Sequence, residues 1–461
     1  MTADFHKVLV VGLGYRTGAA VSNFLASRGI DVTVSDTKSK DDLKSIMNGL
    51  NSSIKVIAGD QSLEILNQGF DIVVLSPGVP KTIPLIKESY NRKIPVISEI
   101  ELAYNYMKGS IIGITGTDGK STTTSLTGHI FKELGFETFV CGNIGVPLIT
   151  FVDRMSDKTI TVIELSSFQL ETIDSFKPDV ASILNVAPDH LDRYKDIYEY
   201  YEAKKRIFMR QDNSDFFIYN CDNEIIENSR TDFPSNSLRF SIYDDCADSF
   251  YRDEKIYVVY DGYIIPVVDV KKLSIIGIHN VYNVMASLLM TVSLHKKLNI
   301  VPDFNKISNA CYTFKGLEHR MEYVGKYSGR SFINDSKATT ISAVEMAVKS
   351  IKDKGVIIIG GRTKGDDYSK LRNIIEEKAR AIILIGESIE FFSEIFKGFN
   401  TVKAGNMEDA VLKAMKNSET GDMILLSPAC ASYDMFEDYE ERGNIFKECF
   451  NKLSDGKISW N

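Results

Sequence analysis

The sequence predicts an α/β protein of three domains. Its 461 residues exceed what one ordinary core holds, because domains usually contain roughly 100–200 residues. Two glycine-rich turns, at residues 12–18 and 116–122, each follow an apolar strand and precede a helix. After Gly316 a third series of alternating strands and helices begins. The expected domains are residues 1–98, 99–315 and 316–461.

The N-terminal segment predicts a Rossmann-like sheet. An apolar strand enters the first glycine turn, and a helix to about Arg28 leads to a second strand. This order is typical of a right-handed βαβ unit in a parallel sheet. The expected strands are residues 7–12, 32–35, 72–75 and 94–97.

The central segment predicts a domain of the P-loop ATPase type with a mostly parallel sheet. Its first strand, at residues 111–115, enters the second glycine turn, and strands then alternate with helices. Asp261-Gly262 lies between two apolar runs and predicts a two-residue hairpin, so part of the sheet is expected to be antiparallel. The other expected strands are residues 161–164, 180–186, 255–260 and 263–268, and the expected helices are residues 200–210 and 281–296.

The C-terminal segment predicts a second Rossmann-like α/β domain, because short apolar runs again alternate with helical patterns. The expected strands are residues 332–334, 356–360, 381–386 and 423–427.

Composition excludes several classes of protein. Lys and Arg number 54 against 62 Asp and Glu, a net charge of −8, which disfavours a nucleic-acid surface. Residues 1–7 lack the layout of a secretory signal, and apolar runs such as residues 356–359 are far shorter than the roughly 18 residues of a membrane span. The 6 cysteines are scattered without a CxxC pair, which indicates reduced, mostly buried thiols. We therefore expect a soluble cytoplasmic protein that binds neither nucleic acid nor membrane.

The first glycine turn has the form of a dinucleotide-binding fingerprint with an extra residue. Gly12, Gly14 and Gly18 supply the turn, and Asp36 follows at the end of the next strand. The chemistry requires a tight turn, a helix N-terminus near a diphosphate and an acidic acceptor for a ribose or a base. A nucleoside diphosphate such as UDP, a nicotinamide dinucleotide and a purely structural turn all stay open from these residues.

The second glycine turn predicts binding of a nucleoside triphosphate. It reads Gly116-Thr117-Asp118-Gly119-Lys120-Ser121-Thr122. Its backbone amides and the following helix start can bind a polyphosphate, while Lys120 adds a mobile charge and Ser121 a hydroxyl for Mg²⁺. Ile114 stands where the usual P-loop has its first glycine, so this loop is shortened. No Asn-Lys-x-Asp motif follows, which disfavours a GTPase.

Polar residues follow two further strands. Glu164 ends an apolar strand at the carboxyl edge of the sheet, where α/β proteins bind ligands, and a carboxylate suits Mg²⁺. Capping of a helix is the alternative role for Glu164. On residue type alone, His190, between Asp189 and Asp192, is a surface histidine, and Lys204 belongs to a solvated helix face.

Several short motifs occur in order along the chain. They are the turn at residues 116–122, Glu164-Leu165-Ser166-Ser167-Phe168-Gln169-Leu170, Asn185, and Asp189-His190-Leu191-Asp192-Arg193-Tyr194. In this order they resemble the Mur ligases, ATP-dependent amide-forming enzymes of peptidoglycan synthesis. Three more motifs are similar to those of the D-glutamate-adding branch of that family: Gly316-Leu317-Glu318-His319-Arg320, Asn334-Asp335-Ser336-Lys337-Ala338-Thr339 and Ser427-Pro428-Ala429-Cys430-Ala431-Ser432. The resemblance spans all three expected domains.

The resemblance implies ATP-dependent ligation of D-glutamate to UDP-N-acetylmuramoyl-L-alanine. Joining an amine to a carboxylate in water is uphill, so transfer of the γ-phosphoryl group is expected to activate the carboxylate as an acyl phosphate. The implied cofactors are ATP and Mg²⁺, the latter as two ions. We expect small-molecule substrates, a monomer, and a third domain that moves during the reaction.

The resemblance also implies roles for particular residues. The implied catalytic residues are Lys120, Glu164, His190 and Lys204, with Lys204 carbamylated, and the implied metal ligands are Ser121, Glu164, His190 and Lys204. The implied ATP contacts are Gly116, Thr117, Asp118, Gly119, Lys120, Ser121, Thr122, Asn280, Asn283, Arg320 and Asp335. The implied contacts of the UDP substrate are Thr17, Asp36, Thr37, Asn143 and His190, and those of D-glutamate are Thr339, Lys364, Ser432 and Tyr439.

Some of these residues have other interpretations. Asn143 can be a turn residue, and Asn280 and Asn283 can cap a helix. Arg362 competes with Lys364 as the cation that holds D-glutamate.

The chain departs from the family pattern at three places. The turn Tyr15-Arg16-Thr17 is a residue longer than the family's usual loop, Asp118 stands where the family often has Asn, and Tyr439 where the D-glutamate branch often has Phe. A different amino-acid acceptor, a nicotinamide dehydrogenase and a nucleotide-sensing module are the alternative functions.

Overall fold

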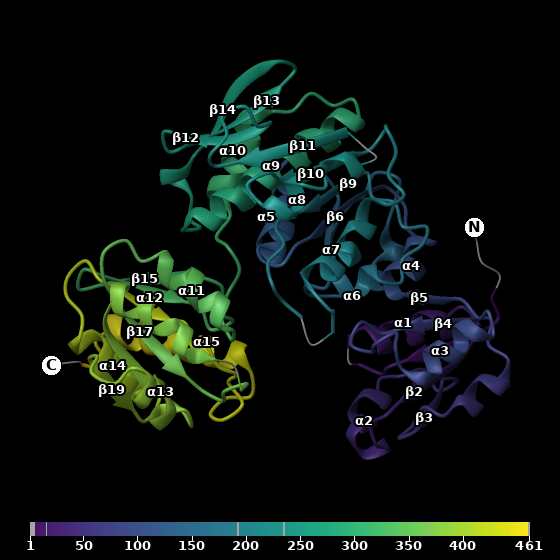
Figure 1. Cartoon of the computed structure of the whole chain (residues 1–461), viewed down its shortest axis with the longest axis horizontal. Helices are drawn as coiled ribbons and strands as arrows, with labels where there is room; N and C mark the ends of the chain where they lie inside the picture. The colour runs from purple at the N-terminus through teal and green to yellow at the C-terminus, as the bar shows by residue number, and fades with distance from the viewer. Residues whose placement is uncertain (1–4, 15, 191–192, 234–235, 366, 460–461) are drawn as a thin grey trace. The chain divides into compact units, whose positions relative to one another are not determined.

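The computed structural model describes residues 5–14, 16–190, 193–233, 236–365 and 367–459. The chain forms an α/β structure with three sheets, which confirms the predicted fold class (Figure 1). It divides into two compact units. One comprises Met1–Lys272 and Val281–Cys311 and contains the first two sheets, and the other comprises Leu273–Asn280 and Tyr312–Asn461 and contains the third. The boundary expected at residue 98 falls inside the first unit and stays a prediction.

The first sheet is parallel, in the order β3-β2-β1-β4-β5. Its strands are β1 (Lys7–Val11), β2 (Asp31–Asp36), β3 (Lys55–Ala58), β4 (Ile72–Leu75) and β5 (Val96–Ser98). The helices of this segment are α1 (Thr17–Ala26), α2 (Lys40–Met47), α3 (Pro84–Asn91) and α4 (Glu99–Tyr104). Successive connections change direction between β1 and β4, so the first glycine turn lies at the switch point where such sheets bind ligands.

The second sheet has the order β14-β13-β12-β11-β10-β9-β6-β8-β7, and every pair from β12 to β7 is parallel. Its strands are β6 (Ser110–Thr115), β7 (Thr138–Gly142), β8 (Ile160–Glu164), β9 (Val180–Ile183), β10 (Phe216–Asn220), β11 (Asn236–Ser241), β12 (Ser249–Arg252), β13 (Lys255–Tyr260) and β14 (Tyr263–Asp269). The helices of this segment are α5 (Lys120–Glu133), α6 (Ser167–Leu170), α7 (Ile197–Lys205), α8 (Glu224–Glu227), α9 (Ile278–Lys297) and α10 (Phe304–Thr313). Because β6 lies between β8 and β9, the second glycine turn leaves the interior of the sheet.

Strands β13 and β14 form the predicted hairpin. Asp261 and Gly262 connect them with φ angles of +48° and +81°. A two-residue turn that follows the right-handed twist of the strands requires positive φ at both positions, which Asp tolerates and Gly favours.

Several element boundaries differ from the prediction by a few residues, two of them at the candidate site. Strand β9 ends at Ile183, earlier than expected, because the chain then turns along the phosphate loop, where Leu184 N donates to Thr115 O at 2.9 Å. Helix α7 begins at Ile197, also earlier, because the Asp196 side chain accepts hydrogen bonds from two amides of its first turn.

The third sheet has the order β15-β16-β20-β17-β18-β19, with only the β15–β16 pair antiparallel among its described pairs. Its strands are β15 (Glu322–Tyr327), β16 (Arg330–Asn334), β17 (Gly355–Gly360), β18 (Ala379–Ile385), β19 (Thr401–Ala404) and β20 (Met423–Leu426). Its helices are α11 (Ile341–Lys349), α12 (Leu371–Lys378), α13 (Ile389–Ile395), α14 (Met407–Lys416) and α15 (Tyr439–Ser454). Short 3₁₀ helices along the chain are η1 (Leu63–Gln68), η2 (Leu148–Thr150), η3 (Val152–Arg154), η4 (Arg206–Phe208), η5 (Arg230–Asp232), η6 (Val270–Lys272) and η7 (Tyr368–Lys370).

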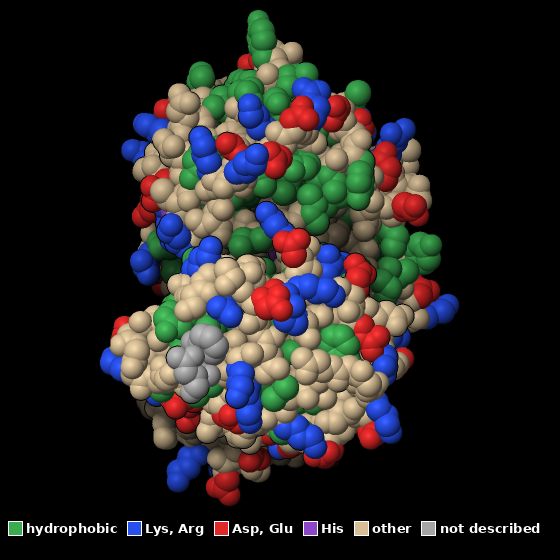
Figure 2. All heavy atoms as spheres, turned by 90° about the vertical axis from the view of Figure 1, so that its left-hand side faces the viewer, with side chains coloured by type: hydrophobic (Ala, Val, Ile, Leu, Met, Phe, Trp, Pro, Cys, Tyr) green, Lys and Arg blue, Asp and Glu red, His purple; other side chains and the backbone are tan. Residues whose placement is uncertain are grey.

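The surface and the cysteines agree with the composition. Figure 2 shows one face of the molecule, on which Lys and Arg side chains are interspersed with Asp and Glu. All six cysteines are free thiols, as predicted, and four of them are buried: Cys141, Cys311, Cys430 and Cys449. Within the described ranges, no helix has the length and apolar character that crossing a membrane requires.

Candidate active site

The second glycine turn connects strand β6 to helix α5. Gly116 and Gly119 have φ angles of +157° and +81°. At Gly119 a Cβ atom would lie 2.4 Å from Asn283 Oδ1, so both conformation and space favour glycine there. Helix α5 then begins at Lys120, and its first amides have no partner inside the helix. These amides, at the positive end of the helix, can bind phosphate oxygens.

Two lysine side chains converge on this turn. Lys120 Nζ donates to the carbonyl oxygens of Gly116 (2.9 Å) and Thr117 (2.7 Å), and Lys204 Nζ donates to the same Gly116 oxygen at 2.8 Å. Lys204 is buried and its Nζ lies 4.2 Å from the centroid of the Tyr200 ring. Burial lowers the pKa of Lys204 well below its ordinary value, and the charge of Lys120 lowers it further. The residue-type prediction of a solvated Lys204 is therefore wrong, because helix α7 turns this side chain toward the loop.

Asn185 holds the outer part of the turn, a role that its sequence did not predict. Asn185 Oδ1 accepts hydrogen bonds from Thr117 N (3.1 Å) and Asp118 N (2.8 Å), and Nδ2 donates to Asp118 O (3.0 Å). The signal that could have found it is its place just beyond β9, the strand beside β6. Parallel neighbours bring residues beyond their carboxyl ends together.

Glu164 lies at the same edge of the sheet, at the end of β8, in register with Ile114 of β6. The carboxylate is buried, and Oε1 accepts a hydrogen bond from Asn143 Nδ2 at 2.7 Å. Oε2 has no hydrogen-bond partner among the described residues. The cap of helix α6 is Ser166, which exchanges hydrogen bonds with Gln169, so the capping role for Glu164 is wrong.

The oxygen atoms of this edge fit a magnesium ion. A buried carboxylate oxygen without a partner is unfavourable unless a cation or a donor satisfies it, as Mg²⁺ would do at Glu164. Ser121 offers a hydroxyl at the start of helix α5. In the described part of the chain no group of three or more His, Cys, Asp and Glu side chains is arranged to hold a metal. Phosphate oxygens and water would complete the coordination, as is usual for Mg²⁺.

His190 follows the Asn185 segment in a left-handed conformation, with φ +53°. Its Nε2 lies 3.5 Å from Asp189 Oδ2, and its side chain is 43% exposed. The centroid of the imidazole ring lies 4.7 Å from that of the Phe168 ring and 6.1 Å from that of the Tyr200 ring. The Tyr200 ring also covers Lys204 Nζ. His190 is therefore placed near Lys204 through a shared aromatic neighbour, while residues 191–192 of the motif lie outside the described ranges.

The first glycine turn is held by its own carboxylate. Asp36 Oδ2 accepts from Leu13 N at 2.6 Å, and Oδ1 accepts from Lys38 N at 2.9 Å. At Gly18 a Cβ atom would lie 2.3 Å from Gly12 O, so glycine lets helix α1 approach the strand. One carboxylate oxygen of Asp36 thus stabilises the glycine turn and the other the segment after β2, and the contact of Asp36 with the UDP substrate stays a prediction.

Thr17 and Thr37 flank this turn. Thr17 is the first residue of helix α1 and is half-buried, whereas Thr37 is exposed directly after β2. Tyr15, in the longer loop of this chain, lies outside the described residues.

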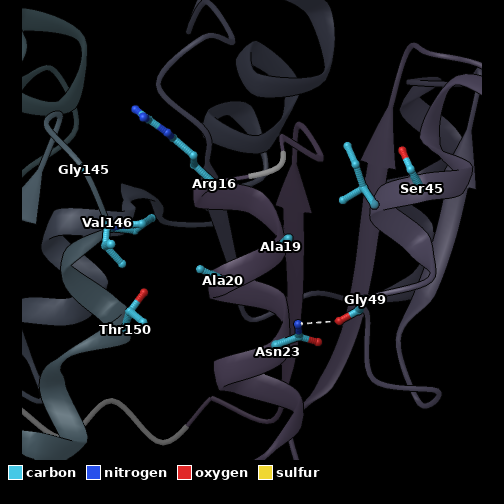
Figure 3. Close-up of a pocket in the computed structure, with 11 residues that line it drawn as sticks. Arg16, Ala19, Ala20, Asn23, Ser45, Gly49, Gly145, Val146 and Thr150 are labelled. Atoms are coloured by element: carbon cyan, nitrogen blue, oxygen red, sulfur yellow. Dashed lines mark hydrogen bonds between the residues drawn. The ribbon is translucent and has the colours of Figure 1, made fainter. Parts of the chain in front are cut away.

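A pocket of about 460 Å³ opens beside helix α1. Figure 3 shows Ala19 and Ala20 on the helix, with Gly145 and Val146 on one side of it, and Arg16 at its start. Arg16 precedes Thr17, and Gly145 closely follows Asn143 in the chain. The pocket therefore adjoins two segments that are predicted to contact the same substrate.

Asn280 and Asn283 lie near the start of helix α9 and are both buried. Asn283 Oδ1 accepts from Thr123 Oγ1 at 3.1 Å, which ties α9 to the phosphate-loop helix. Asn280 Nδ2 donates to Ile276 O at 2.7 Å. These contacts support a structural role for both residues, and their contact with adenine stays a prediction.

In the second unit, Asp335 is buried just beyond strand β16. Its Oδ1 accepts from Met321 N and its Oδ2 from Ser427 Oγ, both at 3.1 Å. Burial raises the pKa of Asp335 to about 7, although these hydrogen bonds oppose the shift. Arg320 is exposed, and its positive charge lowers the pKa of Asp335. The structure therefore brings Arg320 and Asp335 together.

Thr339 and Lys364 also come together, since Lys364 Nζ donates to Thr339 Oγ1 at 3.1 Å. The competing cation, Arg362, pairs with Glu387 through Nε (2.9 Å) and Nη2 (3.3 Å). Because Arg362 already has a carboxylate partner, the arrangement favours Lys364 over Arg362 as the predicted cation, and its contact with D-glutamate stays a prediction.

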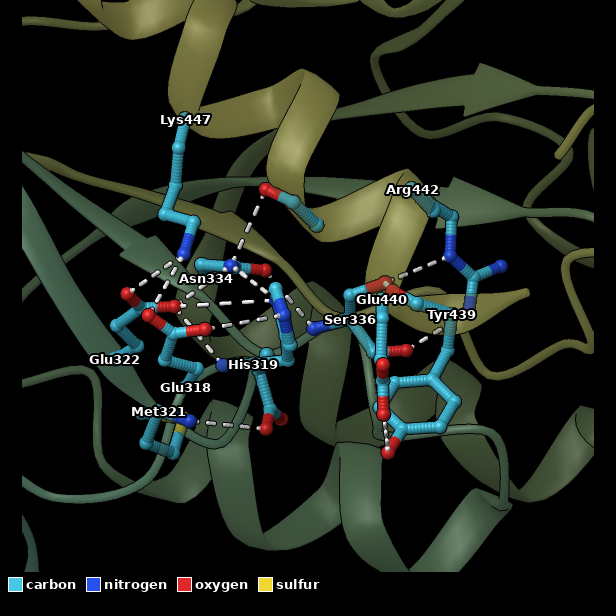
Figure 4. A network of polar contacts seen from close by, with 12 residues as sticks. Glu318, His319, Met321, Glu322, Asn334, Ser336, Tyr439, Glu440, Arg442 and Lys447 are labelled. Atoms are coloured by element: carbon cyan, nitrogen blue, oxygen red, sulfur yellow. Dashed lines mark hydrogen bonds and ion pairs between the residues drawn. The ribbon is translucent and has the colours of Figure 1, made fainter. Parts of the chain in front are cut away.

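Tyr439 begins helix α15, and Ser432 is buried in the segment that precedes it. The Tyr439 hydroxyl donates to Glu440 Oε1 at 2.8 Å, and Lys337 Nζ lies 3.6 Å from the centroid of its ring. Its carbonyl oxygen accepts from Ser336 Oγ at 2.8 Å, so Tyr439 borders the segment that leads to Thr339 (Figure 4).

Arg442, which the sequence did not single out, joins two of these segments. It is buried and donates to Ser336 Oγ (2.9 Å) and Ser336 O (2.8 Å) (Figure 4). It also donates to Cys430 O (3.1 Å). A single arginine in a polar helix carries no signal of burial, so only the tertiary structure identifies it.

Three family models match the chain in order. They are the Mur ligase MurD-like N-terminal domain at residues 6–98, the Mur ligase middle domain at residues 114–291, and the Mur ligase glutamate ligase domain at residues 319–430.

Curated relatives match over nearly the whole chain. The UDP-N-acetylmuramoylalanine–D-glutamate ligase of Koribacter versatilis is 41% identical over 455 residues, covering 97% of this chain and 98% of the relative. The enzyme of the same name from Geotalea daltonii is 40% identical over 457 residues, covering 98% of both chains.

Solved structures share the fold. The MurF ligase of Thermotoga maritima in complex with ADP superposes with a TM-score of 0.59 at 15% identity, covering 97% of this chain and 98% of that one. A pseudomurein peptide ligase type C from Methanothermus fervidus superposes with a TM-score of 0.57 at 21% identity, covering 97% and 99%.

Proposed function

This chain belongs to the Mur ligase family, and from that premise we propose that it ligates D-glutamate to UDP-N-acetylmuramoyl-L-alanine in peptidoglycan precursor synthesis, with cleavage of ATP to ADP and phosphate. One structural observation carries the proposal. At the carboxyl edge of the second sheet, two lysine side-chain nitrogens share the Gly116 carbonyl oxygen of the phosphate turn. Strand β8, which lies beside the strand that enters this turn, ends in a buried carboxylate oxygen that has no partner in the described chain. Such an edge suits a nucleoside triphosphate with its metal ion.

Each expected domain has a proposed role. Residues 1–98 bind the UDP portion of the substrate through the first glycine turn, residues 99–315 bind ATP, and residues 316–461 bind D-glutamate. The third domain moves to complete the ATP contacts through Arg320 and Asp335.

The reaction proceeds in two steps. First, a carboxylate oxygen of the L-alanyl group attacks the γ-phosphorus of ATP, the bond to ADP breaks, and an acyl phosphate forms. The amine nitrogen of D-glutamate then attacks the acyl carbon, phosphate leaves, and the nitrogen loses a proton. The amides at the start of helix α5 and the Lys120 ammonium neutralise the charge of the transferred group.

Mg²⁺ would be held by Ser121, Glu164 and His190, and when bound it would neutralise phosphate charge. Asn143 orients Glu164 by donating to Oε1, which leaves Oε2 for the ion. Carbamylation of Lys204 would add an oxygen ligand. The lowered pKa of Lys204 favours the neutral amine, which is the form that reacts with carbon dioxide.

D-glutamate binds through its two carboxylates. Lys364 and Thr339 form one donor pair, and Ser432 and Tyr439 lie on the segments that Arg442 joins. The proposed oligomeric state is a monomer and the proposed location is the cytoplasm, both on the basis of the family resemblance.

A panel of amino acids in a phosphate-release assay tests the proposal. With ATP, Mg²⁺ and UDP-N-acetylmuramoyl-L-alanine present, only D-glutamate should stimulate phosphate release, and the product should contain one new amide bond by mass spectrometry. Stimulation by L-alanine or a diamino acid in place of D-glutamate would reject the acceptor. Release that needs neither the UDP substrate nor an amino acid would reject ligation altogether.

A further inference from the structure

Asn185 forms hydrogen bonds with the phosphate loop, which is shorter than the usual P-loop. The loop has Ile114 in place of the first glycine, so its backbone cannot wrap as far around a phosphate. The amides of Thr117 and Asp118 already have partners inside the protein. Thr117 N donates to both Asn185 O (3.0 Å) and Asn185 Oδ1 (3.1 Å), and Asp118 N donates to Asn185 Oδ1 (2.8 Å).

The asparagine side chain matches the backbone in both directions. Besides accepting from two amides, Asn185 Nδ2 donates to Asp118 O at 3.0 Å. Both ends of the side-chain amide are therefore used, and a carboxylate could not make the same set because it has no donor. The three side-chain bonds fix the peptide groups on both sides of Asp118, directly before Gly119 and the helix start.

We propose that Asn185 is a positioning residue for nucleotide binding: its side-chain amide replaces the missing part of the P-loop and holds the turn so that the amides at the start of helix α5 face the polyphosphate. This inference rests on the proposed function for the identity of the nucleotide. It assigns phosphate binding to the amides from Gly119 onward and withdraws the amides of Thr117 and Asp118 from the predicted ATP contacts.

The neighbouring contacts strengthen the assignment. Thr117 Oγ1 donates to Ala187 O (3.3 Å) and accepts from Ala187 N (3.0 Å), so the loop lies along the whole segment after β9. That segment continues to Asp189 and His190. A loosened Asn185 would thus disturb the loop first, while the first glycine turn and the third sheet keep their own contacts.

Asn223 provides a matched control. Its Nδ2 donates to Val186 O at 3.0 Å, and its Oδ1 accepts from Ile226 N as the cap of helix α8. Asn223→Ala therefore removes an asparagine that supports the same segment but makes no described hydrogen bond to the phosphate loop.

Calorimetric titration with Mg²⁺-ADP tests the inference on the full chain. Asn185→Ala should weaken ADP binding about tenfold to a hundredfold, as expected for the loss of two or three hydrogen bonds that order the site. Asn223→Ala should change it by no more than about twofold, since a lost helix cap acts on stability. In the ligation assay, Asn185→Ala should raise the KM for ATP by a similar factor and leave the KM for D-glutamate unchanged. Equal weakening in both variants, or undiminished ADP binding by Asn185→Ala, would overturn the inference.

Asn185→Asp keeps the test decisive if the alanine variant does not fold. It keeps the shape and the acceptor, loses the donor to Asp118 O, and adds a negative charge near the phosphates. ADP binding should weaken at pH 8, and binding equal to the wild type at that pH would overturn the inference. Failure of the wild-type protein to bind Mg²⁺-ADP would instead reject the proposed function.

Discussion

Lys364→Met should separate acceptor binding from the rest of the reaction. The Lys364 ammonium is exposed and donates to Thr339 Oγ1 at 3.1 Å, and in the proposed reaction it binds a carboxylate of D-glutamate. Methionine keeps most of the length of the side chain and removes its charge and its hydrogen-bond donors. The matched control is Arg362→Met, which removes the competing cation from the same loop.

The size of the effect follows from exposure. A hydrogen bond to a charged group contributes about 1.5–3 kcal/mol, and the lower end applies because solvent surrounds Lys364. Since 1.4 kcal/mol is a factor of ten, the KM for D-glutamate should rise about tenfold. Arg362 pairs with Glu387 at 2.9 Å, so its loss should raise that KM by no more than about twofold. Both contacts are exposed, so neither substitution should change the stability of the fold measurably.

Steady-state phosphate release at varied D-glutamate, with ATP and the UDP substrate saturating, measures the effect. The KM for ATP should stay unchanged in both variants, and thermal unfolding should show that both remain folded. A larger rise for Arg362→Met than for Lys364→Met would refute the reasoning and assign the carboxylate to the arginine. An equal rise in the KM for ATP would place Lys364 outside the acceptor site.

Three further predictions concern buried polar groups. Arg442→Met should lower the free energy of unfolding by about 3–5 kcal/mol, because the carbonyl oxygens of Ser336 and Cys430 lose their charged donor. Urea titration measures this loss, and a loss below about 1 kcal/mol would contradict the prediction. Burial raises the pKa of Asp335 from 3.8 to about 7, so the folded protein keeps a proton that the unfolded chain releases, and the free energy of unfolding should fall as pH rises through this range. Asp335→Asn should remove the part of this pH dependence that Asp335 causes. If urea titrations of the wild type and the variant give the same pH dependence, the raised pKa does not belong to Asp335. Glu164→Gln should abolish Mg²⁺-dependent phosphate release while binding of the UDP substrate persists by calorimetry, whereas full activity would exclude Glu164 as a metal ligand.

Local patterns predicted much of the fold because their causes are local. Asp261-Gly262 can adopt two positive φ angles in succession, so the hairpin was predictable from two residues. The apolar runs before the two glycine turns became β1 and β6, since a strand buried on both faces must be apolar along its length. The edge strand β3 was not predicted, because its apolar run at residues 56–58 is short and only partly buried.

Site residues were predictable from the sequence where they lie at the end of a strand. They were not predictable where their environment depends on a residue far away in the chain. Glu164 could be placed at the carboxyl edge from its own strand, but its partnerless oxygen depends on how Asn143 approaches. Lys204 was misinterpreted from its basic neighbours, because helix α7 buries Lys204 on the face it turns to the loop and leaves the next lysine partly exposed.

The sequence by itself determined the α/β class, the phosphate-binding turn and the order of motifs that resemble the Mur ligases, because each is written in residues adjacent in the chain. Only the tertiary structure decided which groups share one environment: two lysines on the Gly116 carbonyl, and Asn185 against the turn. The physical reason is that burial and hydrogen bonding between segments depend on distances through space, and strand order alone brings β9 beside β6.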